Sequence, residues 1–139
     1  MNELTKQEIE RLLDKAQEAR DHSYAPYSKY NVGAALLTAD GQIYQGCNIE
    51  NAGFTPTVCA ERTAFFKAVY DGHRAFRAIA VIATGDEMGF PCGVCRQVMA
   101  EFCDRDFVII TANRDRSQVD VSAFEQLLPH SFGPKDLNV

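Results

Sequence analysis

The sequence predicts a single-domain α/β protein, an α/β/α sandwich built on a mixed five-stranded sheet. Its 139 residues are a typical length for one domain, so residues 1–139 are expected to fold as one unit. Two continuous apolar segments, residues 76–84 and 107–112, are typical of strands covered on both faces. A helical segment lies between them, and this order of elements indicates a strand, crossover helix, strand unit.

The first element is an amphipathic helix over residues 5–22. Thr5 is suited to be its N-cap, and Glu8 follows three residues later, which is the spacing of a capping box. Apolar side chains then recur at near-helical spacing at Leu4, Ile9, Leu12, Leu13, Ala16 and Ala19. The charged residues between them are expected to lie on the opposite side of the helix.

A β-hairpin is predicted next. Residues 32–37 and 42–47 have the composition of two strands, and Asp40–Gly41 supplies the turn between them. Residues 48–58 are rich in Asn, Gly and Pro, so we expect a loop there. Loops of this kind often carry binding groups.

The second half of the chain alternates helices and strands. A helix is expected to begin near Cys59 and to end at Gly72, which is the type of residue that ends helices. Residues 92–103 form the crossover helix between the two apolar strands. A short final helix is predicted over 121–129, with Ser122 as its N-cap, followed by an irregular tail.

The composition excludes several classes of protein. Hydrophobic residues are 46% and charged residues 24% of the chain, which favours a packed core over disorder. The net charge of −5 offers a nucleic acid polymer no general attraction, so a small neutral ligand is the expected partner. No segment has the pattern of a signal peptide or the roughly 18 apolar residues of a membrane span, which favours a cytoplasmic protein without a membrane partner.

Three of the five cysteines are candidate metal ligands. Cys92 and Cys95 form a C-x-x-C motif, and Cys59 adds a third thiolate. Three protein ligands with one open position are typical of catalytic zinc, whereas structural zinc usually has four protein ligands. Each ligand segment also opens a predicted helix, whose unpaired amides and dipole stabilise thiolates.

Charged residues accompany the cysteines. Glu61, two positions after Cys59, is placed to take a proton at the open metal position and pass it on. Three thiolates on a divalent cation leave a formal charge of −1, which would make bound water less acidic. Arg62 and Arg96 are candidates to offset this charge by donating hydrogen bonds to sulfur, although each could also be a simple surface arginine.

Other interpretations of the cysteines stay open at this point. A structural zinc site would need a fourth ligand, from Cys47 or His73. A cysteine nucleophile would need a partner among His22, His73 and His130, and no spacing selects one of them. A thioredoxin-type redox pair would account for C-x-x-C but not for the third cysteine and the glutamate.

With C-A-E at 59–61 and P-C-x-x-C at 91–95, the chain resembles the zinc-dependent deaminases. The segments APYSKYNVGAALL, GCNIENA, CAERTA, PCGVCRQ and QLLPHSFGPKDL are similar to the small, homotetrameric, all-cysteine cytidine deaminases. This resemblance covers nearly the whole chain. It implies one zinc ion per subunit held by Cys59, Cys92 and Cys95, with Glu61 as the proton shuttle.

The resemblance also implies a nucleoside site. Asn48 and Glu50 would hydrogen-bond the ribose hydroxyls, a task that an amide and a carboxylate suit. Tyr30 and Ala60 would contact the substrate, and Phe132 would reach the site from a neighbouring subunit. Tyr30 stands where the family more usually has phenylalanine, so its hydroxyl needs a partner or water.

The implied reaction is hydrolytic deamination of cytidine and 2′-deoxycytidine to uridine and 2′-deoxyuridine in pyrimidine salvage. Water activated by zinc would attack the ring carbon bearing the amino group, and Glu61 would protonate the ring nitrogen and then the leaving amine. A deaminase of a cytosine-containing antibiotic or of nucleic acid is the alternative. The acidic charge counts against the polymer, and the NIEN segment counts against the antibiotic.

Overall fold

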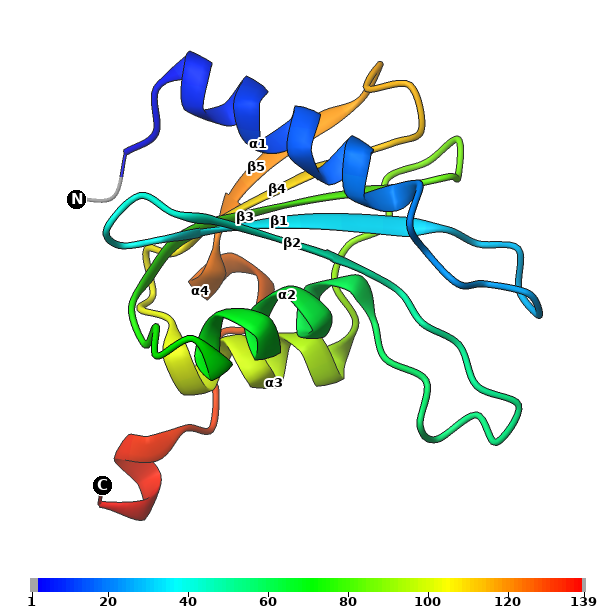
Figure 1. Cartoon of the computed structure of the whole chain (residues 1–139). Helices are drawn as coiled ribbons and strands as arrows, with labels where there is room; N and C mark the ends of the chain where they lie inside the picture. Colours follow the sequence, from blue (N-terminus) through cyan, green and yellow to red (C-terminus); the bar gives the residue numbers. More distant parts are fainter. Residues whose placement is uncertain (1–2, 139) are drawn as a thin grey trace.

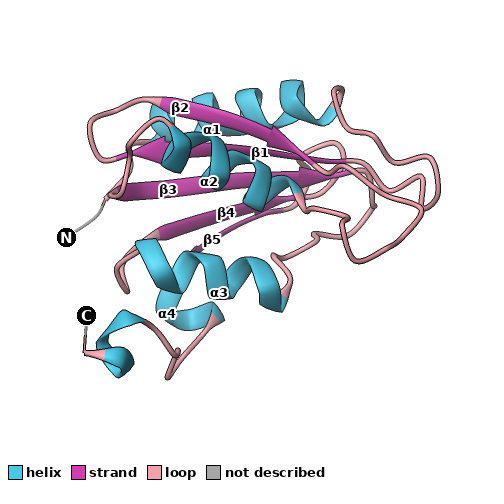
Figure 2. Cartoon of the chain, turned by 60° about the horizontal axis from the view of Figure 1, so that its bottom comes forward, coloured by secondary structure: helices cyan, strands magenta, loops and turns pink. Residues whose placement is uncertain are grey.

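The computed structural model describes residues 3–138 and shows one five-stranded sheet with helices on both faces (Figure 1, Figure 2). This is the predicted α/β/α arrangement. The elements in chain order are α1 (Lys6–Arg20), β1 (Val32–Thr38), β2 (Ile43–Cys47), α2 (Ala60–Tyr70), β3 (Phe76–Ala83), α3 (Gly93–Phe102), β4 (Val108–Ala112), β5 (Val119–Ala123), α4 (Phe124–Leu127) and a 3₁₀ helix (Pro134–Leu137). Within the described residues, none of the helices has the length and apolar character needed to span a bilayer.

The sheet is mixed, with the strand order β2-β1-β3-β4-β5. β1 pairs antiparallel with both β2 and β3, and β4 pairs antiparallel with β5. Only β3 and β4 run parallel, and α3 is the crossover between them. The strand, helix, strand pattern predicted from the two apolar segments is therefore confirmed.

Each face of the sheet builds its own core. Side chains alternate along a strand, so Ala34 and Leu36 of β1 join the cluster under α2 and α3, whereas Ala35 and Leu37 join the cluster under α1. Figure 1 shows α1 alone on one face, with α2, α3 and α4 on the other. Because both faces are covered, the central strands are apolar at nearly every position.

The helix and hairpin signals at the N-terminal end are confirmed. Thr5 Oγ1 accepts from the Glu8 backbone amide at 3.1 Å, and the Glu8 carboxylate accepts from the Thr5 amide at 2.9 Å, which completes the capping box. Gly41 in the hairpin turn and Gly72 after α2 have φ of +94° and +98°. This left-handed region is the one that favours glycine, so both residues act as the sequence predicts.

The prediction of a helix with Ser122 as N-cap is wrong. Ser122 lies inside β5, opposite Ile109 of β4, and the helix is shorter and begins after Ala123. The reason is an alternation of apolar and polar residues over 119–122, which has the two-residue period of a strand at the edge of a sheet. The tail is also more regular than expected, because it contains the 3₁₀ helix.

β2 and α2 approach each other closely at Gly46. A Cβ atom at this position would overlap the carbonyl oxygen of Ala60 and the backbone amide nitrogen of Ala64. The backbone of β2 therefore fixes the distance and tilt of the first turn of α2. That turn carries Glu61 and follows Cys59, so this contact helps to position both residues.

Candidate metal and substrate site

The N-termini of α2 and α3 bring the three cysteines together. Cys59 is the N-cap of α2, Cys92 is the N-cap of α3, and Cys95 lies buried in the first turn of α3. The Sγ atoms of Cys59 and Cys92 are 3.7 Å apart, and those of Cys92 and Cys95 are 3.5 Å apart. All three sulfurs lie within 4.8 Å of one another.

This spacing fits zinc. A tetrahedral site with zinc–sulfur bonds of about 2.3 Å places its sulfurs roughly 3.8 Å apart, close to the separations seen here. Among residues 3–138 the group consists of these three cysteines alone. The thiol of Cys47 instead points to the carbonyl oxygen of His22 at 3.5 Å, and the His73 ring lies beside Asp40. Neither residue supplies the fourth ligand that a structural site would require.

The cluster favours thiolate formation. Arg62 Nη2 donates to the Cys59 sulfur at 3.3 Å. Without metal, a hydrogen bond from Cys95 lowers the pKa of Cys59 to about 5, and Arg62 adds to this effect. Cys95 donates its proton in this hydrogen bond to Cys59, and this raises the pKa of Cys95. Binding of a divalent cation would replace these protons, because the thiolate is the form that binds metal.

Arg96 has a different environment. Its Nε donates to the carbonyl oxygen of Pro91 at 2.8 Å, and its Nη1 donates to that of Leu127 at 2.6 Å. These bonds join the residue just before Cys92 to the end of α4. In the structure the Arg96 guanidinium therefore orients the segment that carries the ligand, and Arg62 is the arginine that donates to sulfur.

Glu61 is buried beside the sulfurs. Only 5% of the residue is exposed, and burial raises the pKa of its carboxyl group to about 7, with a further contribution from the charge of Cys59. A carboxyl group with such a pKa exists in both protonation states near neutral pH. It can therefore both accept and donate a proton.

Glu61 and two of the three cysteines line a cavity of about 210 Å³. Four of the residues predicted for the site, Tyr30, Asn48, Ala60 and Glu61, contribute to its wall together with Cys59 and Cys92. The sequence argument missed the other contributors, which come from strands β1 and β3 and from the loops before α2 and α3. They are Val32, Thr57, Val58, Val81, Ala83, Gly89 and Phe90.

Asn48 and Glu50 hold the loop before β1. The Asn48 side chain accepts from the Val32 amide at 2.9 Å and donates to the Tyr30 carbonyl at 2.7 Å. Glu50 does not line the cavity; its carboxylate accepts from the backbone amides of Tyr27 and Ser28 at 3.1 Å and from the Ser28 hydroxyl. These hydrogen bonds lower the pKa of Glu50, and the bond from the Ser28 hydroxyl has the largest effect.

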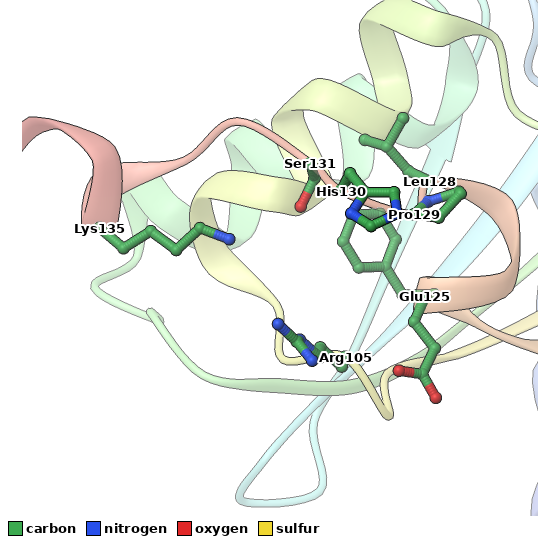
Figure 3. Close-up of a pocket in the computed structure, with 8 residues that line it drawn as sticks. Arg105, Glu125, Leu128, Pro129, His130, Ser131 and Lys135 are labelled. Atoms are coloured by element: carbon green, nitrogen blue, oxygen red, sulfur yellow. The ribbon is translucent and has the colours of Figure 1, made fainter.

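Phe132 lies outside this cavity, in the segment between α4 and the 3₁₀ helix, and is 57% exposed. Its carbonyl oxygen accepts from the Gln97 side chain at 2.9 Å, which anchors the segment to α3. A separate cavity of about 320 Å³ beside this segment is lined by Arg105, Leu128 and Lys135, among others (Figure 3). None of the cysteines lines it, so it is distinct from the metal cluster.

Comparison with known proteins points to one family. Residues 6–111 match the cytidine and deoxycytidylate deaminase zinc-binding region. A cytidine deaminase of Sporosarcina psychrophila is 48% identical over 131 residues, which are 94% of this chain and 96% of the relative. The crystal structure of cytidine deaminase from Burkholderia pseudomallei has a TM-score of 0.85 and 42% identity, covering 93% of this chain and 100% of that one. The structure of the Mycobacterium tuberculosis cytidine deaminase has a TM-score of 0.77 and 33% identity, covering 89% and 96%.

The protein has a mixed sheet, and two helices packed on it carry three cysteines and a buried glutamate at their N-termini. This combination of fold and site defines a zinc-dependent deaminase. More narrowly, this chain belongs to the cytidine and deoxycytidylate deaminase family.

Proposed function

We propose that the protein deaminates cytidine and 2′-deoxycytidine hydrolytically, giving uridine or 2′-deoxyuridine and ammonia. One observation carries the proposal: a buried Glu61 carboxyl group lines the same cavity of about 210 Å³ as Cys59 and Cys92, two members of the three-cysteine cluster. Cys59, Cys92 and Cys95 would hold one zinc ion per chain. Three ligands leave a coordination position free, as catalysis at zinc requires.

Bound zinc would make a water molecule acidic enough to react near neutral pH. Glu61 is the group that moves protons. It accepts a proton from the attacking water and delivers it to the ring nitrogen of the base. It then takes the remaining proton from the added oxygen and donates it to the leaving amine, as the carbon–nitrogen bond breaks and the carbonyl group forms. Burial raises the pKa of its carboxyl group above the usual range, and this direction suits a group that must both accept and donate a proton. Arg62 stabilises the negative charge on Cys59 throughout.

The substrate side of the cavity is assigned to the NIEN loop and to Tyr30. An amide side chain has two N–H donors and two acceptor lone pairs, so Asn48 keeps one of each after its bonds to Tyr30 and Val32. We assign this spare capacity, with a carboxylate oxygen of Glu50, to the ribose hydroxyls. The Tyr30 ring and Ala60 would flank the substrate in the same cavity.

The decisive test is Glu61→Gln, which keeps the shape of the side chain but removes the titrating group. We expect one zinc ion per chain, an unchanged melting temperature within a few degrees, and at least about 10³-fold loss of cytidine turnover, followed by ultraviolet absorbance. Glu101→Gln, at an exposed position of α3, serves as the control and should keep full activity. Full turnover in Glu61→Gln would contradict the proposed role of this cavity.

We also propose that the chain assembles as a homotetramer in the cytoplasm. Its five cysteines are free, as expected in a reducing compartment. Large side chains of α2 are exposed, with Phe66 at 51% and Tyr70 at 90%, and they line an open, mainly apolar cavity of about 510 Å³ beside β2. Exposed aromatic clusters of this kind are typical of interfaces between subunits.

The assembly proposal gives Phe132 a role in a neighbouring site, and subunit mixing tests it. Light scattering should give four times the chain mass. Phe132→Ala should lower kcat/KM for cytidine, whereas subunits carrying Glu61→Gln are inactive but keep Phe132. Mixed tetramers of the two variants should regain activity, because intact Phe132 then meets intact Glu61. A mixture with only the summed activity of its parts would contradict this role.

A further inference from the structure

Tyr30 lies against the loop that joins β3 to α3. Its ring carbon Cε1 would be 3.6 Å from a Cβ atom built on Gly85, and its hydroxyl oxygen occupies the space where a Cβ on Gly89 would be. Gly89 and Tyr30 also line the substrate cavity side by side with Phe90. The loop therefore accommodates the tyrosine hydroxyl only because residue 89 has no side chain.

The backbone of Tyr30 is fixed independently of this contact. The Tyr30 amide donates to Ser28 Oγ at 3.0 Å, and its carbonyl oxygen accepts from Asn48 at 2.7 Å. Among the described residues, no hydrogen bond involves the Tyr30 hydroxyl group. The direction of the ring is therefore set by packing against the loop and not by a polar anchor at its end.

We propose that Gly89 is a positioning residue. Because it has no Cβ, the Tyr30 hydroxyl can pack against its backbone, and this packing keeps the Tyr30 ring in the wall of the substrate cavity. Tyr30 is 42% exposed, so the ring has solvent into which it can turn. A side chain at residue 89 would be accommodated most easily by that rotation, because the hydroxyl is the far end of a side chain. Gly89 thereby controls substrate affinity while contributing little to stability.

The inference rests on the proposed function, since it takes this cavity as the substrate site. Gly89→Ala places a Cβ on the hydroxyl oxygen, whereas its next nearest atoms, Cβ of Ala83 and Cζ of Tyr30, are 3.7 Å away. Removing the hydroxyl alone should therefore make room for the alanine. This predicts a specific rescue of Gly89→Ala by Tyr30→Phe.

The experiment is a double-mutant cycle on the zinc-loaded protein, with KM and kcat for cytidine and the melting temperature measured for each variant. We expect Gly89→Ala to raise KM by about tenfold, with kcat less affected and the melting temperature nearly unchanged, as overpacking displaces the ring. Tyr30→Phe alone supplies the reference KM for a cavity wall without the hydroxyl group. The double variant should have a KM within about threefold of that reference, so that Gly89→Ala has little effect once the hydroxyl is absent.

Gly85→Ala is the matched control, because a Cβ there meets neighbours only at 3.4 Å or more and should leave KM unchanged. The inference is overturned if Gly89→Ala leaves KM unchanged, if Tyr30→Phe does not rescue it, or if Gly85→Ala raises KM equally. A Gly89→Ala protein that fails to fold also overturns it, because the effect would then be on stability. Failure of the proposed function is distinguishable, because the unmodified zinc-loaded protein would then not convert cytidine at all.

Discussion

Replacing Gly46 by alanine should impair both folding and catalysis. The added Cβ would overlap two backbone atoms of α2, the carbonyl oxygen of Ala60 and the amide nitrogen of Ala64. Neither atom can rotate away, so the helix must move or β2 must bend. Overpacking of this kind costs about 1–3 kcal/mol, which for a chain of this size lowers the melting temperature by roughly 4–12 °C.

The displacement would also reach the site. Cys59 and Glu61 flank Ala60, and a shift of about 1 Å in a catalytic group can cost on the order of 10²-fold in rate. Calorimetry and cytidine turnover would measure the two effects. Gly93→Ala controls for stability, because a Cβ there meets no atom within 4 Å and alanine favours helix. A Gly46→Ala protein with unchanged melting temperature and kcat/KM would refute the claim that this contact positions α2.

Three further outcomes are expected. Arg20→Ala should lower the free energy of unfolding in urea by about 1–2 kcal/mol, because Nη1 of Arg20 donates to the carbonyl oxygens of Ala83 and Arg114 at 3.1 and 3.2 Å; a value near zero would mean that water replaces these bonds. Arg62→Gln should weaken zinc binding about 10- to 100-fold in a chelator competition, and unchanged affinity would contradict its role at Cys59. In zinc-free protein, the raised pKa of Glu61 means that stability is lost as pH rises from about 4.5 to about 7. Glu61→Gln removes this loss, so it should stabilise the protein by roughly 2 kcal/mol more at pH 8 than at pH 5. Equal effects at both pH values would show that Glu61 ionises normally.

The sequence predicted the elements whose signals are local and periodic. The capping box at Thr5, the turn at Gly41 and the apolar strands all depend on neighbouring residues, and each lies where expected. β5 could not be located in this way. It is a five-residue edge strand, too short for its alternation to outweigh the helical pattern that begins one residue later.

The residues of the candidate site also differ in whether a local sequence signal predicts them. The C-x-x-C motif and the C-A-E segment are local signals, so the cysteine cluster and Glu61 could be proposed from the chain alone. Gly89 had no such signal, because a glycine in a loop of Asp, Glu, Met and Gly residues predicts only a turn. Its importance appears only when Tyr30, far away in sequence, is seen to occupy the space above it.

The cysteine cluster and the proposed substrate wall are also built differently. The three cysteines lie at the N-termini of two helices, so the helix backbone sets the positions of their sulfurs. These helix ends are rigid and depend on main-chain packing such as that at Gly46. The wall around Tyr30 is held by side chains, through the bonds of Asn48 and Glu50 to the loop before β1. A substitution in that loop can therefore alter substrate binding while the cysteines remain in place. Zinc content and KM should consequently respond to different sets of substitutions in this protein.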